Sequence, residues 1–315
     1  MRRGRRSIGQ QTTVHRREDT VKTLLVFGGS GQLGNALLAL AGDRWEVHAP
    51  SSIEVSLLNP AVVRAHIEAL RPSVIINAAA YTKVDDAERE RDAAYAINAV
   101  APEAMAVAAQ DVGAHFVHVS TDYVFDGAGT VPYSTSAQTN PLGVYGASKL
   151  EGELRVAGAC PGAAIVRTAW LHSGRGTNFV RTALQLLSAG TSMRVVDDQV
   201  GTPTRARTVA AVLLQMAERR DIAGLHHCTD AGVASWYDVA VAVRDALMVA
   251  GNLADGVTVV PVNSAAFPRP ARRPAVAILD TYALRRTLGW TPPPWRDGVR
   301  ASVNELLGGR GSDQR

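Results

Sequence analysis

The sequence is poor in cysteine and has no long apolar run. Its two cysteines, Cys160 and Cys228, stand far apart in a chain of 315 residues, so neither a disulfide framework nor a cysteine metal cluster is expected. No stretch of about eighteen consecutive apolar residues exists, which excludes a membrane-spanning helix. The N-terminus has arginines but no apolar region with a small-residue cleavage site, so it does not predict a secretory signal. We therefore expect a cytoplasmic protein without a membrane partner.

The net charge of +4 comes from one end of the chain. Residues 1–20 hold six arginines against Glu18 and Asp19, which accounts for the whole excess, so the remainder is neutral. A short basic stretch with Gly and Gln is typical of a disordered extension. We assign it no function and expect no nucleic-acid partner.

The remaining chain begins with a dinucleotide-binding pattern. An apolar run, 23–27, leads into Gly28-Gly29-Ser30-Gly31-Gln32-Leu33-Gly34, and leucines at helical spacing follow. Strand, glycine turn and helix in this order let the backbone approach a diphosphate, whose charge meets the helix N-terminus. A glycine-rich hairpin is the alternative interpretation.

Polar residues follow the next apolar runs. The run 74–77 leads to small and polar residues at 78–82, and the run 116–119 leads to Ser120, Thr121 and Asp122. Open α/β sheets bind ligands at the carboxyl ends of their strands. Ser, Thr and Asp also favour turns without any chemistry. A further strand is expected within 163–171, and helices are expected at 87–100 and 206–219.

Tyr145 and Lys149 stand four residues apart, soon after Asn140-Pro141. In a helix that starts near the proline, this spacing puts both side chains on one face. The ammonium is then expected to lower the pKa of the phenol and make it a usable acid. A surface helix that carries Tyr and Lys by chance is the other interpretation.

Seven stretches in this order resemble the extended short-chain dehydrogenase/reductases, and within them the dTDP-4-dehydrorhamnose reductases. The likeness runs from about residue 22 to the C-terminal helix. The stretches are GGSGQLG (28–34), NAAAYTKVDDAE (77–88), STDYVFDG (120–127), NPLGVYGASKLEGE (140–153), RTAWLH (167–172), DDQVGTPT (197–204) and RPARRP (269–274).

The resemblance implies an α/β fold with two parts. A Rossmann-like, doubly wound parallel sheet that binds NAD(P) is expected over 21–168, and a smaller α+β substrate lobe mainly over 169–310. The helix at 206–219 is expected to return to the sheet, and a strand at 224–228 is grouped with the lobe. The implied activity is NAD(P)H-dependent reduction of the 4-keto group of a dTDP-6-deoxyhexulose to dTDP-L-rhamnose.

The resemblance also assigns site residues. Tyr145, Lys149 and Thr121 are implied as catalytic. Cofactor contacts are implied for Gly28, Gly31, Gln32, Leu33, Gly34, Ser51, Ser56, Leu57, Ala79, Ala80, Tyr81, Thr82 and Asn98, besides Tyr145 and Lys149. Substrate contacts are implied for Thr121, Asp122, Trp170, Gln199 and Arg273. No metal ligand is assigned, although some relatives use Mg²⁺ between protomers, and a homodimer is expected.

Several alternatives stay open. Asn98 also suits a buried packing role, Trp170 a place in the core, and Arg273 a solvated basic loop. After the strand 45–49 the chain reads Pro50-Ser51-Ser52, without an acid that would repel a 2′-phosphate, which favours NADPH over NADH. A reductase or epimerase of another nucleotide sugar, or a non-catalytic NADP-binding regulatory subunit, remains an alternative function.

Overall fold

The computed structural model describes residues 21–310, apart from the side chains of residues 309 and 310. The basic extension expected at 1–20 lies outside the described residues. None of the helices within 21–310 is long and apolar enough to cross a membrane.

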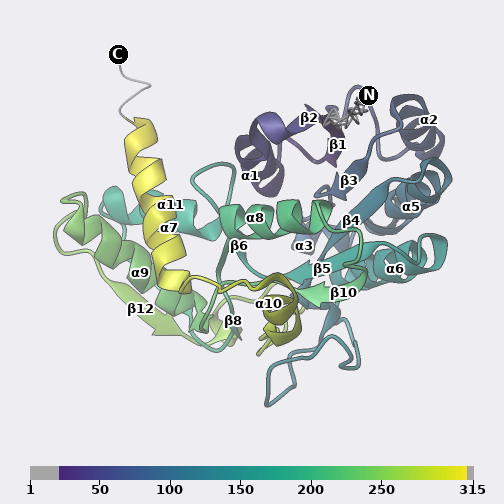
Figure 1. Ribbon diagram of the computed structural model, residues 1–315. Helices are drawn as coiled ribbons and strands as arrows, with labels where there is room; N and C mark the ends of the chain where they lie inside the picture. The colour runs from purple at the N-terminus through teal and green to yellow at the C-terminus, as the bar shows by residue number, and fades with distance from the viewer. Residues whose placement is uncertain (1–20, 311–315) are drawn as a thin grey trace, which may run out of the picture.

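A six-stranded parallel sheet forms the centre of the protein (Figure 1). Its strand order is β10-β5-β4-β3-β1-β2, and every neighbouring pair is parallel. Most of these strands are nearly continuous apolar runs because both faces of the sheet are covered. The strands are β1 (Lys22–Phe27), β2 (Trp45–His48), β3 (Val74–Asn77), β4 (His115–Thr121), β5 (Ala164–Thr168) and β10 (Gly224–His227).

Helices cover the two faces, which confirms the predicted doubly wound sheet. Helices α1 (Gln32–Ala41) and α8 (Ala206–Ala217) enclose one apolar core, which includes Leu37 and Leu213. Helices α2 (Pro60–Leu70), α5 (Ala101–Val112) and α6 (Val144–Ala159) enclose the other. Figure 1 shows α2, α5 and α6 together on one side of the sheet.

The topology positions a crevice at the centre of the sheet. β1 lies between β2 and β3. After β2 the chain crosses back over β1, and the later strands β3, β4, β5 and β10 extend the sheet on the other side. The connections on either side of this switch point diverge, and ligands of such sheets bind at the carboxyl ends of the strands there. The glycine turn follows β1, and the segment 78–82 follows β3 at the same edge.

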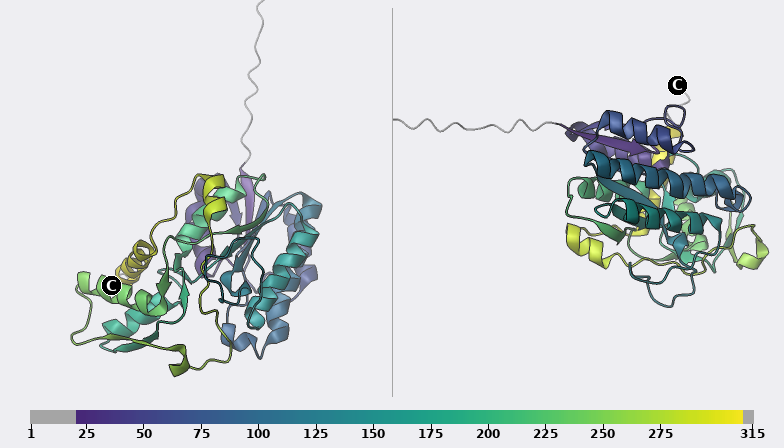
Figure 2. Two further views of the ribbon diagram at one scale, coloured as in Figure 1. Left: turned by 90° about the horizontal axis from the view of Figure 1, so that it is seen from below. Right: turned by 90° about the vertical axis from the view of Figure 1, so that its right-hand side faces the viewer.

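A second core lies beside the sheet. It is built by α7 (Phe179–Ser188), α9 (Trp236–Val249) and α11 (Trp295–Arg310), with β7 (Met193–Val196) paired to β12 (Val259–Val262). Figure 2, left, shows these green and yellow elements to one side of the purple and blue ones. Two short pairs complete the described strands: β6 (Leu171–His172) is parallel to β9 (Thr204–Arg205), and β8 (Val200–Gly201) is antiparallel to β11 (Ala234–Ser235).

Three local predictions were wrong or incomplete. The strand at 224–228 was grouped with the lobe, but β10 pairs with β5 and extends the main sheet. The helix expected at 87–100 starts at Arg91 as α4 (Arg91–Tyr95), widens into a π turn at Ala96–Val100 and continues as α5. Helix α2 was not predicted, although Asn59 caps it and Pro60 occupies its first turn, a recognised start signal.

Candidate active site

The glycine turn after β1 forms a cradle for a diphosphate. Gly28 has a φ of +83°, and a Cβ there would come within 2.6 Å of the Ala79 backbone nitrogen. A Cβ at Gly34 would lie 2.1 Å from the Gly28 carbonyl oxygen. Side chains at these places would fill the cradle or push the segment after β3 away. Helix α1 starts at Gln32, so its N-terminal N–H groups and dipole favour an anion here.

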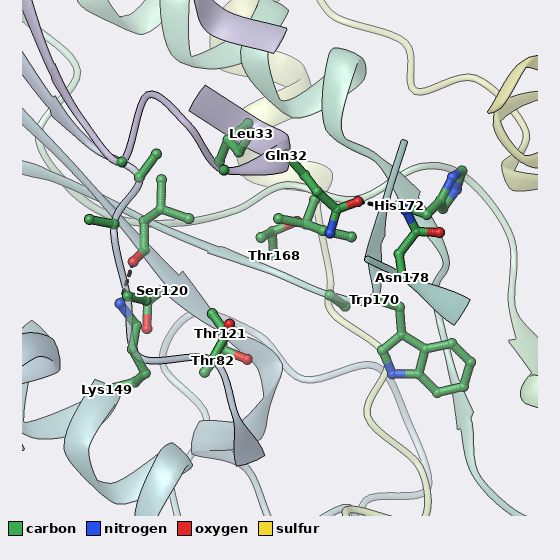
Figure 3. A pocket seen from close by; sticks show the side chains of 18 of the residues that line it. Gln32, Leu33, Thr82, Ser120, Thr121, Lys149, Thr168, Trp170, His172 and Asn178 are labelled. Atoms are coloured by element: carbon green, nitrogen blue, oxygen red, sulfur yellow. Dashed lines mark hydrogen bonds between the residues drawn. The ribbon is translucent and has the colours of Figure 1, made fainter. Parts of the chain in front are cut away.

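A cavity of about 610 Å³ opens beside this turn. It brings together residues from β1, β3, β4 and α6 with residues of the lobe, as expected for a ligand at the switch point. Figure 3 shows Lys149 on one side of it and Trp170 and Asn178 on the other. The predicted site residues that line it are Gly28, Gly31, Gln32, Leu33, Leu57, Ala79, Ala80, Thr82, Thr121, Asp122, Tyr145, Lys149 and Trp170.

Helix α6 carries Tyr145 and Lys149 to the cavity wall. It starts at Val144, whose backbone N–H donates to Glu88 Oε1 at 2.8 Å, so a carboxylate satisfies the first turn. Lys149 is 2% exposed, and its Nζ donates to the Val119 carbonyl oxygen at 2.7 Å. This contact fixes the ammonium beside the end of β4.

Burial dominates the ionisation of both groups. It raises the pKa of Tyr145 to about 12; the nearby Thr121 hydroxyl acts in the opposite direction, and the charge of Asp122 adds to the rise. Burial lowers the pKa of Lys149 to about 8, and the Glu153 carboxylate opposes this. The expectation that Lys149 lowers the pKa of Tyr145 is not met in this structure, because burial raises that pKa and Lys149 is not among the groups that shift it.

Thr121 and Asp122 form a buried polar pair at the end of β4. Thr121 Oγ1 donates to Asp122 Oδ1 at 3.0 Å and accepts from the Tyr123 N–H at 3.2 Å. Burial raises the pKa of Asp122 to about 7, and the Thr121 hydrogen bond opposes the rise. Asp122 Oδ2 is buried without a hydrogen-bond partner among the described residues. This orphaned oxygen marks a place where a ligand hydroxyl would be accepted.

Aromatic side chains form the far wall. Trp170 and Trp236 stack with ring centroids 3.7 Å apart and planes 4° apart, and Phe179 meets Trp236 edge-on. Trp170 has a φ of +47°, a left-handed conformation that is strained for a residue with a Cβ and is often found at functional sites. Trp236 and Phe179 were not predicted as site residues. Ser235 caps α9, which puts Trp236 at the first helical position, but no local sequence pattern shows that this position faces the cavity.

Several predicted residues lie outside this cavity. Gly34, Ser51, Ser56, Tyr81 and Asn98 do not line it, although Gly34 shapes the turn as described above. Asn98 is fully buried; its Oδ1 accepts from Tyr81 N at 2.8 Å, and its Nδ2 donates to Tyr81 O at 3.2 Å and Ser148 Oγ at 3.0 Å. It thereby ties the 79–82 segment to α6, so any effect on a cofactor passes through these partners.

Gln199 and Arg273 line a second cavity of about 430 Å³. Tyr123, Phe179 and Trp236 line both cavities, so the two meet at these rings. The Arg273 guanidinium forms a two-point ion pair with Asp85, at 3.0 and 2.8 Å. Arg273 therefore joins the 269–274 segment to α3 (Val84–Ala87), an attachment that the sequence did not indicate.

A polar bridge crosses the first cavity at the glycine turn. Gln32 Oε1 accepts from Asn178 Nδ2 at 2.9 Å (Figure 3). It also accepts from Ser173 Oγ at 3.1 Å, and Gln32 Nε2 donates to the Thr177 carbonyl at 3.4 Å. Asn178 also caps α7 by accepting from Arg181 N at 3.0 Å. Asn178 was not predicted as a site residue, although an Asn just before an apolar helix is a cap signal.

Among residues 21–310, no group of three or more His, Cys, Asp or Glu side chains is arranged to hold a metal ion.

The fold and the cavity define a protein of the NAD(P)-binding Rossmann class, with a second, smaller lobe beside the sheet. The chain belongs to the family described as "RmlD substrate binding domain", whose model matches residues 22–307.

Named relatives extend this assignment. A dTDP-4-dehydrorhamnose reductase of Burkholderia thailandensis is 40% identical over 90% of this chain and 99% of its own length. A Streptomyces antibioticus protein, named "Probable dTDP-4,6-dihydroxy-2-methyloxan-3-one 4-ketoreductase", is 38% identical over 90% of this chain and 95% of its own. The crystal structure of the Bacillus anthracis dTDP-4-dehydrorhamnose reductase in complex with NADP has a TM-score of 0.85 and 33% identity, and covers 91% of this chain and 100% of that one.

Proposed function

We propose that this protein uses NADPH or NADH to reduce the 4-keto group of dTDP-4-dehydro-6-deoxy-L-mannose (dTDP-4-dehydrorhamnose). The product is dTDP-L-rhamnose, and the reaction is the last step of dTDP-rhamnose synthesis. One observation carries the proposal: Tyr145, Lys149 and Thr121 line the same cavity as the glycine turn. The relatives named as dTDP-4-dehydrorhamnose reductases support the choice of substrate.

The residues have complementary roles in this reaction. The nicotinamide supplies the hydride when it is bound. Tyr145, whose pKa of about 12 keeps the phenol protonated at neutral pH, donates a proton to the forming alkoxide. Thr121 orients the carbonyl, and Lys149, held by Val119, contributes positive charge beside the reacting oxygen and a donor for the nicotinamide ribose.

The second cavity suits the nucleotide end of the substrate. Its aromatic walls, Tyr123, Phe179 and Trp236, offer faces against which a base or sugar packs. Arg194 and Arg269 bring guanidinium groups that suit a diphosphate. In this arrangement the coenzyme binds on the Rossmann side, 21–168, and the lobe within 169–310 holds most of the sugar nucleotide. Binding of the remote nucleotide then holds the ketone close to the hydride.

In the direct test, purified protein is mixed with dTDP-4-dehydrorhamnose and with either NADPH or NADH. We expect loss of the reduced-coenzyme absorbance and formation of one equivalent of dTDP-L-rhamnose. A panel of other 4-keto nucleotide sugars serves as comparison. The proposal is wrong if dTDP-4-dehydrorhamnose is not reduced while another member of the panel is.

A second candidate is a 4-ketoreductase for another dTDP sugar. The Streptomyces relative favours it, because it is named for a different keto sugar and is 38% identical over 90% of this chain. The same panel separates the two, because the preferred sugar has the higher kcat/KM.

We also propose a homodimer in the cytoplasm. This rests on the family resemblance and is tested by size-exclusion chromatography with light scattering. A Mg²⁺ requirement stays a prediction, and activity after treatment with EDTA measures it.

A further inference from the structure

A carboxylate lies near the end of β2, although none of the residues that directly follow this strand is acidic. The residues directly after β2 are Ala49, Pro50, Ser51 and Ser52, with neither an acid nor an arginine. In dinucleotide-binding folds, an acid at this place accepts a hydrogen bond from the adenine ribose 2′-hydroxyl, whereas an arginine accommodates a 2′-phosphate. A tight turn at 51–55 brings Glu54 back towards Ser51. The sequence alone predicted no acid near the end of β2, and Glu54 now supplies one.

Two hydrogen bonds fix the turn. The Ser51 N–H donates to Glu54 Oε2 at 2.7 Å, and the Glu54 N–H donates to Ser51 Oγ at 3.3 Å. The bond from the Ser51 backbone, then its hydroxyl, holds the pKa of Glu54 below its usual range, so the side chain is an anion at neutral pH. Ser51 stands between Pro50 and Ser52, which both line the first cavity. Glu54 is exposed and does not itself line the cavity, so its carboxylate lies beside the wall that Pro50 and Ser52 form, close to the end of β2.

No fixed positive charge balances it there. Of the described residues that line this cavity, Lys149 alone is a lysine or arginine. Its ammonium donates to the carbonyl oxygen of Val119 in β4. His66 of α2 lies near enough to lower the pKa of Glu54. The Ser51 N–H, a potential donor to a phosphate, is already bonded to Glu54.

We propose that Glu54 sets the coenzyme preference of this protein towards NADH. The carboxylate accepts a hydrogen bond from the 2′-hydroxyl of NADH and repels the 2′-phosphate of NADPH. This inference rests on the proposed function for its coenzyme class and adds the residue that discriminates within the class.

Isothermal titration calorimetry at pH 8 measures the dissociation constants of NADH and NADPH without any sugar. We expect the wild type to bind NADH about tenfold more tightly, because a charged acceptor and a repelled phosphate act in the same direction. Glu54→Gln keeps the shape of the turn and should reduce the ratio of the two constants about three- to tenfold. Ser52→Arg should tighten NADPH binding about tenfold by adding a phosphate partner at the rim.

Glu68→Gln is the matched control, because Glu68 is an exposed acid on α2 that pairs with Arg64. It changes the net charge equally and should leave the ratio unchanged. A wild type that binds NADPH as tightly as NADH, or a Glu54→Gln ratio equal to that of the wild type, overturns the inference. A protein with the expected ratio that reduces no dTDP sugar contradicts the proposed function and leaves this inference standing.

Discussion

Tyr145 is the residue on whose proton the proposed reduction depends. Its partly buried ring lies near Thr121 and meets Tyr123 edge-on, with ring centroids 5.4 Å apart. Removal of water keeps the phenol neutral, and a neutral phenol is the form that can donate. The alkoxide that forms beside it is the stronger base, so the proton has a favourable acceptor.

Replacing Tyr145 by Phe removes this proton and preserves the ring. We expect turnover to fall by about two to four orders of magnitude, while coenzyme binding stays nearly unchanged. Steady-state kinetics and calorimetry measure the two effects separately. Tyr282→Phe, at an exposed position on α10 (Tyr282–Leu288), is the control and should be neutral. An unchanged rate in Tyr145→Phe would remove this residue from the mechanism.

Asp122 links stability to pH. Its folded-state pKa of about 7 lies above the ordinary carboxyl value of 3.8. Between these values the native protein retains a proton that the unfolded chain has released, so stability decreases as pH rises from about 4 to 7. Asp122→Asn abolishes this dependence and keeps an acceptor for Thr121.

We therefore expect Asp122→Asn to raise the melting temperature relative to the wild type more at pH 8 than at pH 5. Thermal unfolding monitored by circular dichroism at the two pH values measures the difference. An equal effect at both would show that the Asp122 carboxyl titrates normally in the folded protein.

Helix α6 is the element that places Tyr145 and Lys149 together. Its first N–H group is satisfied by Glu88 from the 84–90 segment, and a Cβ added at Gly143 would lie 2.6 Å from the same Glu88 oxygen. A small residue before the helix therefore leaves room for the cap. The start of α6 depends on a contact between segments more than fifty residues apart.

Loss of this cap should destabilise the protein and disturb the site. We expect Glu88→Ala to cost about 1 kcal/mol of unfolding free energy, whereas Glu88→Gln keeps an acceptor and should cost less. Gly143→Ala should displace Glu88 and have a similar effect. Because both changes act on one contact, the double variant should lose less than the sum of the two. Additive losses in denaturant unfolding would separate Gly143 from the cap.

The elements differed in how far the sequence could predict them. The strands at 23–27, 74–77 and 116–119 were confirmed, because apolar runs buried on both faces are visible locally. The pairing of β10 with β5 was missed, since a strand's sequence does not name its neighbour. The π turn at Ala96–Val100 depends on tertiary contacts of Asn98, which the chain does not display before it folds.

The candidate site, too, was predicted only in part from the sequence. The glycine turn, Thr121, Tyr145 and Lys149 were expected on one cavity, and the structure brings them together. Their ionisation was not predictable from helical spacing, because the pKa values depend on burial. Trp236, Asn178 and the return of Glu54 to Ser51 depend on where the lobe and a turn lie in space, so only the folded chain reveals them.

At the scale of the whole molecule, the first cavity is formed between the sheet and the lobe. Gln32 reaches across it from the cofactor turn to Ser173, Thr177 and Asn178 at the start of α7. The bridge links the glycine turn to the 173–178 segment. A ligand held at the turn is therefore coupled to the 173–178 segment.

Gln32→Met keeps the length of the side chain and removes its hydrogen bonds. We expect faster amide hydrogen exchange in 173–178 and coenzyme binding weaker by about three- to tenfold, as for the loss of one or two net hydrogen bonds. Gln185→Met, on the exposed face of α7, is the control. Unchanged exchange in 173–178 would show that the bridge does not restrain this segment.

The stacked indoles of Trp170 and Trp236 give this protein an optical signature of its own. Two rings with centroids 3.7 Å apart are close enough for their electronic transitions to couple, so their contribution to the far-ultraviolet dichroism depends on how the two rings are oriented. Because one ring follows the sheet and the other begins a helix of the lobe, any sliding of the two parts changes this contribution. Circular dichroism can therefore report a change in the relative position of Trp170 and Trp236 without an added label.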